Sequence, residues 1–176
     1  MGNPSNIDRR FDKPAIDALV DLLNASNKSH IRYGEIEADQ VTPMLGLESA
    51  DINTSVRIRL AGAQEGSPSS TVHYWRQALD AFILVPTFLI YVEGQPTSVL
   101  FDQLRQFHGV WLTPEDTTLM IGEAGPEGMR VVTFVPQIDH MVWRGSLAVE
   151  AGPMGHLRSV IVENEVEGFT REAIVA

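Results

Sequence analysis

The N-terminal part of the chain carries apolar residues at the spacing of one helical face. Asp12 is a candidate N-cap, and Pro14 is permitted in a first helical turn because its missing N–H would have no partner there. The run from 24 to 29 is rich in Asn and Ser, which favour turns. We therefore predict a helix over 15–24. Its apolar positions are Ile16, Leu19, Val20 and Leu23, with Asp17, Asp21 and Asn24 opposite.

The same spacing returns around residue 100. Thr97 or Ser98 is a candidate cap, and His108-Gly109 ends the stretch with the residue type that most often follows a helix. The pattern predicts a second helix over 98–107. Its apolar positions are Leu100, Leu104 and Phe107.

Strand patterns lie between and after these helices. A strict alternation of apolar and charged residues begins at Val56 and ends at Leu60, with Arg57 and Arg59 between apolar neighbours. This alternation predicts a strand with one buried face and one wet face. A Gly/Ser/Pro loop at 62–70 follows and makes the next segment its hairpin partner. Further strands are predicted over 71–75, 117–121, 130–135, 141–150 and 157–162.

The most apolar stretch of the chain runs from 81 to 92. It is shorter than the roughly 20 residues of a membrane-spanning helix, and Pro86 interrupts it, so we expect no membrane span. Its β-branched and aromatic residues favour extended segments. The stretch is either interior or a contact surface between subunits. The candidate contact residues are Phe82, Ile83, Leu84, Val85, Phe88, Leu89 and Tyr91.

The order of these elements predicts an α+β fold of two small antiparallel β units, each preceded by a helix. The repeated order suggests the hypothesis of an internal duplication. The expected organisation is an N-terminal arm over 1–14, an α+β structural domain over 15–162 with lobes at 15–80 and 97–150, and an acidic C-terminal tail over 163–176.

Composition narrows the classes of function. The chain has 176 residues, no cysteine and a formal net charge of -10. The absence of cysteine excludes disulfides, thiolate metal sites and a cysteine nucleophile, and it fits folding in a reducing cytoplasm. The negative charge repels phosphate backbones, so we expect no nucleic-acid partner.

The residue types that carry chemistry form no recognised motif. The five histidines include no His-x-x-x-His spacing, and Asp139-His140 would point to opposite faces of a strand. The acids form two clusters along the sequence. A cation-dependent enzyme would require three or more of these acids to converge in a cleft. We predict no catalytic residue, no metal ligand and no cofactor. The clusters are Glu35, Glu37 and Asp39, and Glu163, Glu165, Glu167 and Glu172.

Aromatic residues suggest one alternative function. Tyr74, Trp75, Trp111 and Trp143 fit core packing, but two coplanar and exposed rings among them would form a platform for sugars. A carbohydrate-binding module that uses sheet aromatics is therefore the alternative reading.

The order of several motifs resembles the virion structural proteins of jumbo tailed bacteriophages. The resemblance covers roughly residues 15–150, although the Tyr-Asn-Arg motif of those proteins reads Tyr74-Trp75-Arg76 here. The motifs are Asp21-Leu-Leu-Asn-Ala-Ser-Asn27, Glu37-Ala-Asp-Gln-Val-Thr42, Asn53-Thr-Ser-Val-Arg-Ile-Arg59, Val72-His-Tyr-Trp-Arg-Gln-Ala-Leu79, Leu104-Arg-Gln-Phe-His-Gly-Val-Trp-Leu-Thr-Pro-Glu-Asp116 and Asp139-His-Met-Val-Trp-Arg-Gly-Ser-Leu147.

The resemblance implies a non-enzymatic component of the virion, in the baseplate, tail, fibre attachment or capsid-associated layer. Its expected partners are other virion proteins and copies of itself, and its expected location is the virion after assembly in the bacterial host cytoplasm. The resemblance supplies no catalytic residue.

Overall fold

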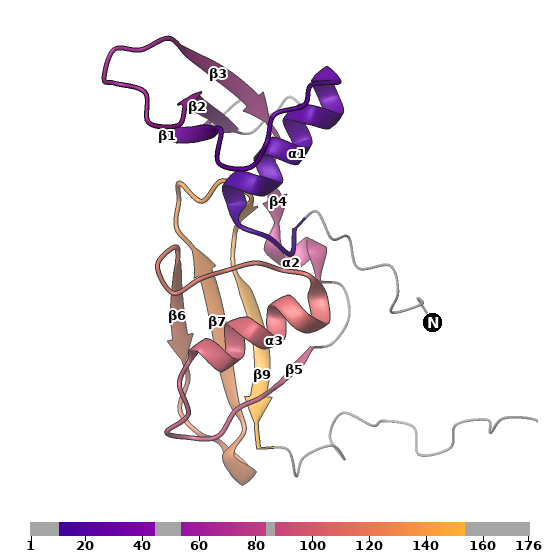
Figure 1. The fold of residues 1–176 in the computed structure, drawn as a ribbon. Coiled ribbons are helices and arrows are strands. Elements are labelled where there is room, and N and C mark those ends of the chain that lie inside the picture. The colour runs from indigo at the N-terminus through magenta and orange to yellow at the C-terminus, as the bar shows by residue number, and fades with distance from the viewer. Residues whose placement is uncertain (1–10, 45–53, 84–86, 154–176) are drawn as a thin grey trace, which may run out of the picture.

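The computed structural model describes residues 11–44, 54–83 and 87–153, which form two lobes stacked end to end (Figure 1). Each lobe has one helix packed on one face of a small sheet, and a short two-stranded sheet lies between the lobes. The predicted α+β class is confirmed. Three antiparallel strands of each main sheet follow a helix, but the C-terminal sheet has a fourth strand, Phe88–Ile90, that precedes its helix and pairs in parallel.

The N-terminal lobe consists of helix α1 (Ala15–Asn27) and the antiparallel sheet β1-β2-β3. Its strands are β1 (Ile36–Pro43), β2 (Thr54–Leu60) and β3 (Ser69–Tyr74). The predicted hairpin of the second and third strands is confirmed, since Val56 pairs with Val72. The buried core of this lobe is Leu19, Val20, Leu23, Ile36, Val56 and Tyr74.

The boundaries of α1 differ from the prediction. The helix begins after Pro14 and has no side-chain cap, so Asp12 is not its N-cap. It continues past residue 24 to Asn27, followed by Lys28 in the left-handed conformation. Asn24 stays helical because its amide group bonds the loop: it donates to the Ile31 carbonyl and accepts from the Ile31 N–H, both at 2.8 Å.

The C-terminal lobe packs helix α3 (Ser98–His108) on a four-stranded sheet of order β5-β9-β7-β6. The predicted end of the helix is confirmed, because Gly109 adopts the left-handed conformation with φ 65°. The core is built from Leu100, Phe101 and Leu104 of α3 and the inward residues of the strands. The strands are β5 (Phe88–Ile90), β6 (Thr117–Ile121), β7 (Arg130–Pro136) and β9 (Leu147–Gly152), and a 3-10 turn, η2 (Pro126–Gly128), lies between β6 and β7.

A short region joins the two lobes. Strand β4 (Gln77–Ala78) runs into helix α2 (Leu79–Phe82), and β4 pairs in parallel with β8 (Trp143–Arg144). Gly145, with φ 79°, separates β8 from β9, so the predicted strand over 141–150 is two strands.

Other parts of the sequence prediction need correction or lie outside the described residues. The extended reading of 81–92 is wrong at its start, because α2 reaches Phe82. Among the described residues of this stretch, Phe88–Ile90 form a strand. Strand β1 was not predicted, because a bulge between Ala38 and Gln40 interrupts its alternation. The predicted strand at 157–162 and the tail at 163–176 lie outside the described residues.

The two lobes share an order of elements. In each, a helix is followed by three antiparallel strands that pair in chain order, β1-β2-β3 and β6-β7-β9, although β8 comes between the last two along the chain. This common order is compatible with the duplication hypothesis, which stays a prediction.

Candidate functional site

The structure places the predicted contact stretch mainly inside the C-terminal lobe. Ile83, Leu89 and Tyr91 belong to its buried core. Phe82 is half-buried, with its ring 5.0 Å from that of Trp143. We therefore do not assign a contact surface to the stretch as a whole. Of the remaining predicted residues, Phe88 is half-buried in β5, and Leu84 and Val85 lie outside the described residues.

The four aromatic residues considered for sugar binding do not gather on one surface. Tyr74 and Trp143 are buried. Trp111 is half-buried beneath the Arg105 guanidinium, 4.7 Å from its ring centre. Trp75 is exposed and is covered on one side by Arg144. These positions provide no pair of coplanar exposed rings.

A dense set of hydrogen bonds joins the two lobes. The Tyr74 hydroxyl donates to the Met141 carbonyl at 2.7 Å. The guanidinium of Arg76 donates to the carbonyls of Ile138 and His140 at 2.7 and 3.1 Å. The Gln77 N–H donates to the next carbonyl, that of residue 142, at 2.9 Å. The connection after β3 therefore bonds the loop before β8 at four carbonyls, which fixes the orientation of the lobes.

Burial controls the electrostatics of this joint. Desolvation raises the pKa of Tyr74 to about 12, against a smaller opposing effect of the Arg76 charge, so the hydroxyl keeps its proton and remains a donor. Desolvation lowers the pKa of Arg76 from its ordinary value. Its bonds to carbonyl oxygens offset part of the cost of burying the charge.

His140, in the loop before β8, lies close to Asp116, which immediately precedes β6. His140 Nδ1 accepts the N–H groups of Val142 and Trp143, both at 3.0 Å, so the proton of the neutral ring lies on Nε2. Nε2 lies 3.5 Å from Asp116 Oδ2. Burial raises the pKa of Asp116, but bonds from His140, the Thr113 N–H and the Thr117 hydroxyl outweigh it and lower the pKa overall. Because Nδ1 accepts the N–H groups of two residues that follow it, His140 holds the loop before β8 in its conformation.

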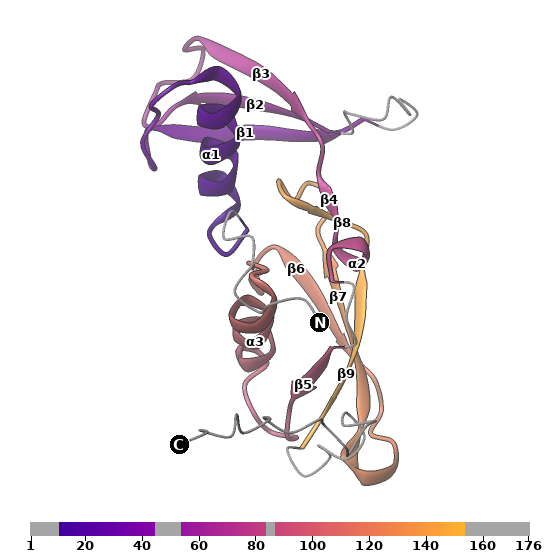
Figure 2. The same ribbon diagram turned by 90° about the vertical axis from the view of Figure 1, so that its right-hand side faces the viewer.

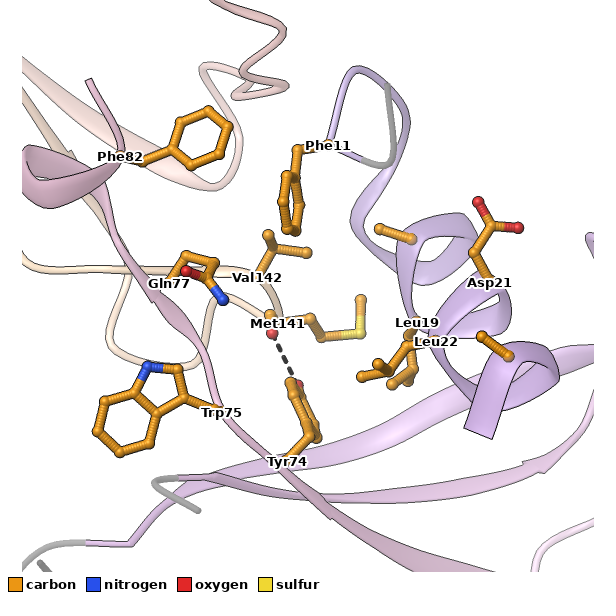
Figure 3. Close-up of a pocket in the computed structure, with 12 residues that line it drawn as sticks. Phe11, Leu19, Asp21, Leu22, Tyr74, Trp75, Gln77, Phe82, Met141 and Val142 are labelled. Atoms are coloured by element: carbon orange, nitrogen blue, oxygen red, sulfur yellow. Dashed lines mark hydrogen bonds between the residues drawn. The ribbon is translucent and has the colours of Figure 1, made fainter. Parts of the chain in front are cut away.

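An apolar cleft of about 300 Å³ lies where the lobes meet (Figure 3). Leu19 and Leu22 of α1 form one wall, while Trp75 and Phe82 lie on the other. Phe11 closes one end: its ring lies 5.3 Å from Phe82, and its carbonyl accepts the N–H of residue 111. The last residues of the predicted N-terminal arm are thus anchored at the joint.

The predicted acid clusters do not converge. Glu37 and Asp39 pair with Arg59 and Arg57, respectively, and Glu35 accepts the N–H of residue 32. Among the described residues, no three His, Asp or Glu side chains are grouped as a metal site would require. The acids from 163 onward lie outside the description.

The outer face of the N-terminal sheet, opposite α1, is polar. Register places Arg57 and Arg59 of β2 beside Thr71 of β3 and Glu37 of β1 on this face. The Arg59 guanidinium lies 3.4 Å from the Glu37 carboxylate. We call this surface the charged face, and it consists of Glu37, Asp39, Ser55, Arg57, Arg59, Ser69, Thr71 and His73.

Figure 2 shows α3 on one side of the C-terminal sheet, and the outer face on the other side differs in chemistry from that of the N-terminal sheet. Inward Val132 and Phe134 are fully buried, whereas Val131 of the same strand is 51% exposed and Met120 of β6 is 53% exposed. Cross-strand register continues the row from Val131 through Glu150 to Phe88. We call this surface the apolar face, and it consists of Phe88, Thr118, Met120, Val131, Thr133, Val135, Ala148 and Glu150.

The apolar face carries a single charged side chain, Glu150, among these eight residues. No described helix covers it (Figure 2), although Met129, just after η2, packs over Gly152 at one end. Sequence reasoning missed this surface because β7 is uncharged after Arg130 on both of its sides, which is typical of a strand buried on both faces.

Comparison with known families identifies the chain. The model of DUF7941, a family of unknown function, matches residues 9–172. The chain belongs to this family. The match of the DUF7941 model includes both lobes and the joint. Comparisons with curated proteins and with solved structures found no match. No helix within the described part of the chain is long and apolar enough to cross a membrane.

Proposed function

We propose that this protein is a non-enzymatic structural component of a tailed-phage virion that acts through protein–protein contacts. Its place is the baseplate, the tail, the fibre attachment or a capsid-associated layer, with other virion proteins and copies of itself as partners. The observation that carries the proposal is the apolar face, an open sheet surface with one charge among eight residues. Exposed apolar patches of this kind mark sites of protein interaction.

The joint supports the same proposal. Tyr74 and Arg76 bond the carbonyls of the loop before β8, and these donors are buried. A contact surface on one lobe is then held at a fixed orientation to the other lobe. Such preorganisation lowers the entropy lost on assembly, which favours a protein that is built into a larger particle. The resemblance to jumbo-phage virion proteins supplies the kind of particle.

The first test is mass spectrometry of purified particles of the encoding phage. We expect the protein in the particles at a constant copy number relative to the major structural proteins. Its absence from particles, with the protein present in infected cells, would overturn the proposal.

A labelling experiment locates the contact. The chain has no cysteine, so one introduced thiol gives a unique signal. Ala148→Cys places an exposed thiol on the apolar face, and Thr71→Cys is a matched exposed control on the charged face. We expect maleimide to label both free proteins, and to label only the Thr71→Cys protein once it is assembled. Equal labelling of the two thiols in particles would contradict a contact through the apolar face.

A further inference from the structure

A surface hollow of about 390 Å³ lies where the apolar face meets the joint between the lobes. It includes Thr118 and Val135, which pair across β6 and β7 at one end of the apolar face. None of the described residues that line it is an aspartate or a glutamate, although the chain has 23 acidic residues. We call it the basic hollow, and it is lined chiefly by Arg76, Thr118, Val135, Gln137, Ile138 and Arg144.

Arg144 is held in place on two sides. Its guanidinium lies 5.1 Å from the centre of the Trp75 ring, and its Nε donates to the Arg76 carbonyl at 3.4 Å. The residue is exposed, and no carboxylate of a described residue pairs with it. A stacked guanidinium is planar and preorganised, so it loses little conformational freedom when it binds an acceptor. The terminal N–H groups of Arg144 are therefore suited to an acceptor from another molecule.

Arg105 has the same arrangement with an acid from its own chain. It is also exposed, and its guanidinium lies 4.7 Å from the centre of the Trp111 ring. Asp102, one turn earlier on α3, accepts a hydrogen bond from this guanidinium at 3.0 Å. Arg144 thus has the cation and the ring of the Arg105 site but lacks the acid.

The two arginines of the basic hollow also repel each other. Burial is the main cause that lowers the pKa of Arg76, and the nearby Arg144 charge lowers this pKa further. Tyr74 and Asp139 act in the opposite direction. An anion in the hollow would lie near both guanidinium groups and would offset their repulsion. Because Arg76 already donates to carbonyls of the loop before β8, we expect Arg144 to make the direct contact.

We infer that the basic hollow binds the carboxylate of an aspartate or glutamate that belongs to the protein covering the apolar face. The carboxylate accepts two N–H groups of the Arg144 guanidinium, a geometry that arginine favours. The exposed hydroxyl of Thr118 is a further donor in the hollow. Trp75 and Ile138, which is 75% exposed, supply apolar surface around the ion pair. Tryptophan and arginine are enriched at the energetic centres of protein interfaces.

A carboxylate on a protein fits this site better than the phosphates of a nucleic acid. Nucleic acids bind through many lysines and arginines, whereas the hollow has two arginines in a chain of net charge -10. Its surroundings are apolar as well. Ile138 lines the hollow, and Met120, next to Thr118 on the same face of β6, is 53% exposed. An apolar surface with one embedded charge is complementary to a protein partner.

The basic hollow also gives the apolar face a direction. Glu150, the single charge of that face, pairs with Val131, which lies four residues from Val135 along β7. At about 3.3 Å per residue, roughly 13 Å of strand separate the two positions. The surface therefore has a positive end at the joint and a negative end away from it. A partner with an acid opposite the hollow is held in one orientation, because the reversed orientation brings its acid to Glu150.

Zero-length cross-linking in particles tests the contact. Arg144→Lys keeps the positive charge and supplies an amine, which a carbodiimide condenses with a touching carboxylate to form an amide. We expect mass spectrometry to find this amine joined to one aspartate or glutamate of a neighbouring polypeptide. Arg105→Lys is the matched control and should join to Asp102 of its own chain, which already pairs with that position.

Two outcomes of this experiment count against the inference. The first is a particle that contains the Arg144→Lys protein but shows no link from residue 144. The second is a link from residue 144 to Asp139, an acid of the same chain that acts on Arg76. Either outcome would overturn binding of a partner's carboxylate in the basic hollow.

A second test needs no phage particle. The arginine Nε–Hε signals of the full chain, followed by NMR, report on each guanidinium, and the Arg144 signal is identified by its absence in Arg144→Gln. Titration with acetyl-Leu-Glu-Leu-amide should shift this signal. Acetyl-Leu-Gln-Leu-amide should bind at least about tenfold more weakly, because a charged acceptor forms the stronger hydrogen bond. The Arg105 signal, already paired, should shift little with either peptide.

The same titration separates the other possible occupants. Equal binding of the two peptides would mean that the hollow takes apolar groups alone. Tighter binding of inorganic phosphate than of the glutamate peptide would make it a phosphate site. Either result, or an Arg144 signal that no peptide shifts, would overturn the inference.

This inference rests on the proposed function, because the acid belongs to the protein that covers the apolar face, but the two fail separately. Absence of the protein from particles would remove the virion role, and the peptide titration would still decide whether the hollow binds a carboxylate. A protein present in particles whose residue 144 forms no link would keep the virion role and remove the carboxylate contact.

Discussion

The two lobes have the same layers but differ on the sheet face that their helix leaves uncovered. On the charged face, Arg57 and Arg59 each lie beside a carboxylate, so the surface is suited to water. On the apolar face, Val131 and Met120 are half exposed and Glu150 is the single charge. Depletion of charge distinguishes the core of a protein interface from ordinary surface. The difference indicates that the C-terminal sheet is adapted to a partner and the N-terminal sheet to solvent.

The largest expected loss of stability tests the feature that the two lobes share, the inner sheet face that is covered by a helix. Phe134, on the inner face of β7, is fully buried and packs edge-on against Phe101 of α3. Phe134→Ala should lower the free energy of unfolding by about 3–5 kcal/mol, because it removes a large buried ring and leaves a cavity. Urea denaturation measures this. Phe107→Ala, at an exposed position of α3, should change the value by about 0.5 kcal/mol or less. Equal losses in the two variants would contradict the assignment of the inner face.

The next effect tests whether the lobes act as one body. Arg76→Met removes the donor to the Ile138 and His140 carbonyls, which leaves buried acceptors without a partner. We expect a loss of about 2–4 kcal/mol, since each unsatisfied buried group costs about 1–3 kcal/mol. We also expect the single unfolding transition to separate into two, seen by calorimetry. Arg144 is an exposed residue that lies over Trp75 and donates one long bond, 3.4 Å, to the Arg76 carbonyl, so Arg144→Met should cost less, about 1 kcal/mol. A single transition in Arg76→Met would show that other contacts unite the lobes.

Acid should destabilise both lobes by protonating one aspartate in each, Asp21 and Asp116. Burial raises the pKa of Asp21, but hydrogen bonds from Lys13 and Tyr33 lower this pKa overall. The pKa of Asp116 is likewise raised by burial and lowered overall by bonds from His140, Thr113 and Thr117. A lowered native pKa means that the unfolded chain binds more protons. The stabilisation is therefore complete above the ordinary aspartate pKa of about 3.9 and is lost as the pH falls through the native value.

Asp116→Asn should thus reduce the fall in unfolding free energy between neutral and acidic pH. At neutral pH the unfolding free energy of the variant should be lower by about 1 kcal/mol, the usual net contribution of one hydrogen bond to stability. Denaturation midpoints at several pH values measure both effects. An unchanged slope in the variant would show that Asp116 does not carry the acid sensitivity of its lobe. Asp21→Asn is the corresponding variant in the N-terminal lobe.

Much of the fold was accessible from the sequence, because periodicity reports burial. Helical spacing located α1 and α3, and the alternation from Val56 to Leu60 gave β2. Strand β1 was missed, because its bulge breaks the alternation on which the prediction depends. The stretch 81–92 suggested a surface because it is apolar, but Leu89 is buried under α3. Apolarity alone does not distinguish a core from an interface, and only the register revealed the apolar face.

The smallest expected change in stability gives the sharpest test of the comparison between the two faces. Val131→Thr keeps the shape of the side chain and replaces one exposed methyl by a hydroxyl, so the unfolding free energy should change by about 0.5 kcal/mol or less. Retention on a hydrophobic interaction column should nevertheless fall, because Val131 is one of the most exposed apolar residues of the apolar face. Thr71→Val makes the reverse change on the charged face and should raise retention less than Val131→Thr lowers it, since the neighbouring arginines hold water there. If the two substitutions shifted retention by equal amounts, the two faces would be equally apolar, and nothing would assign the contact to the C-terminal lobe.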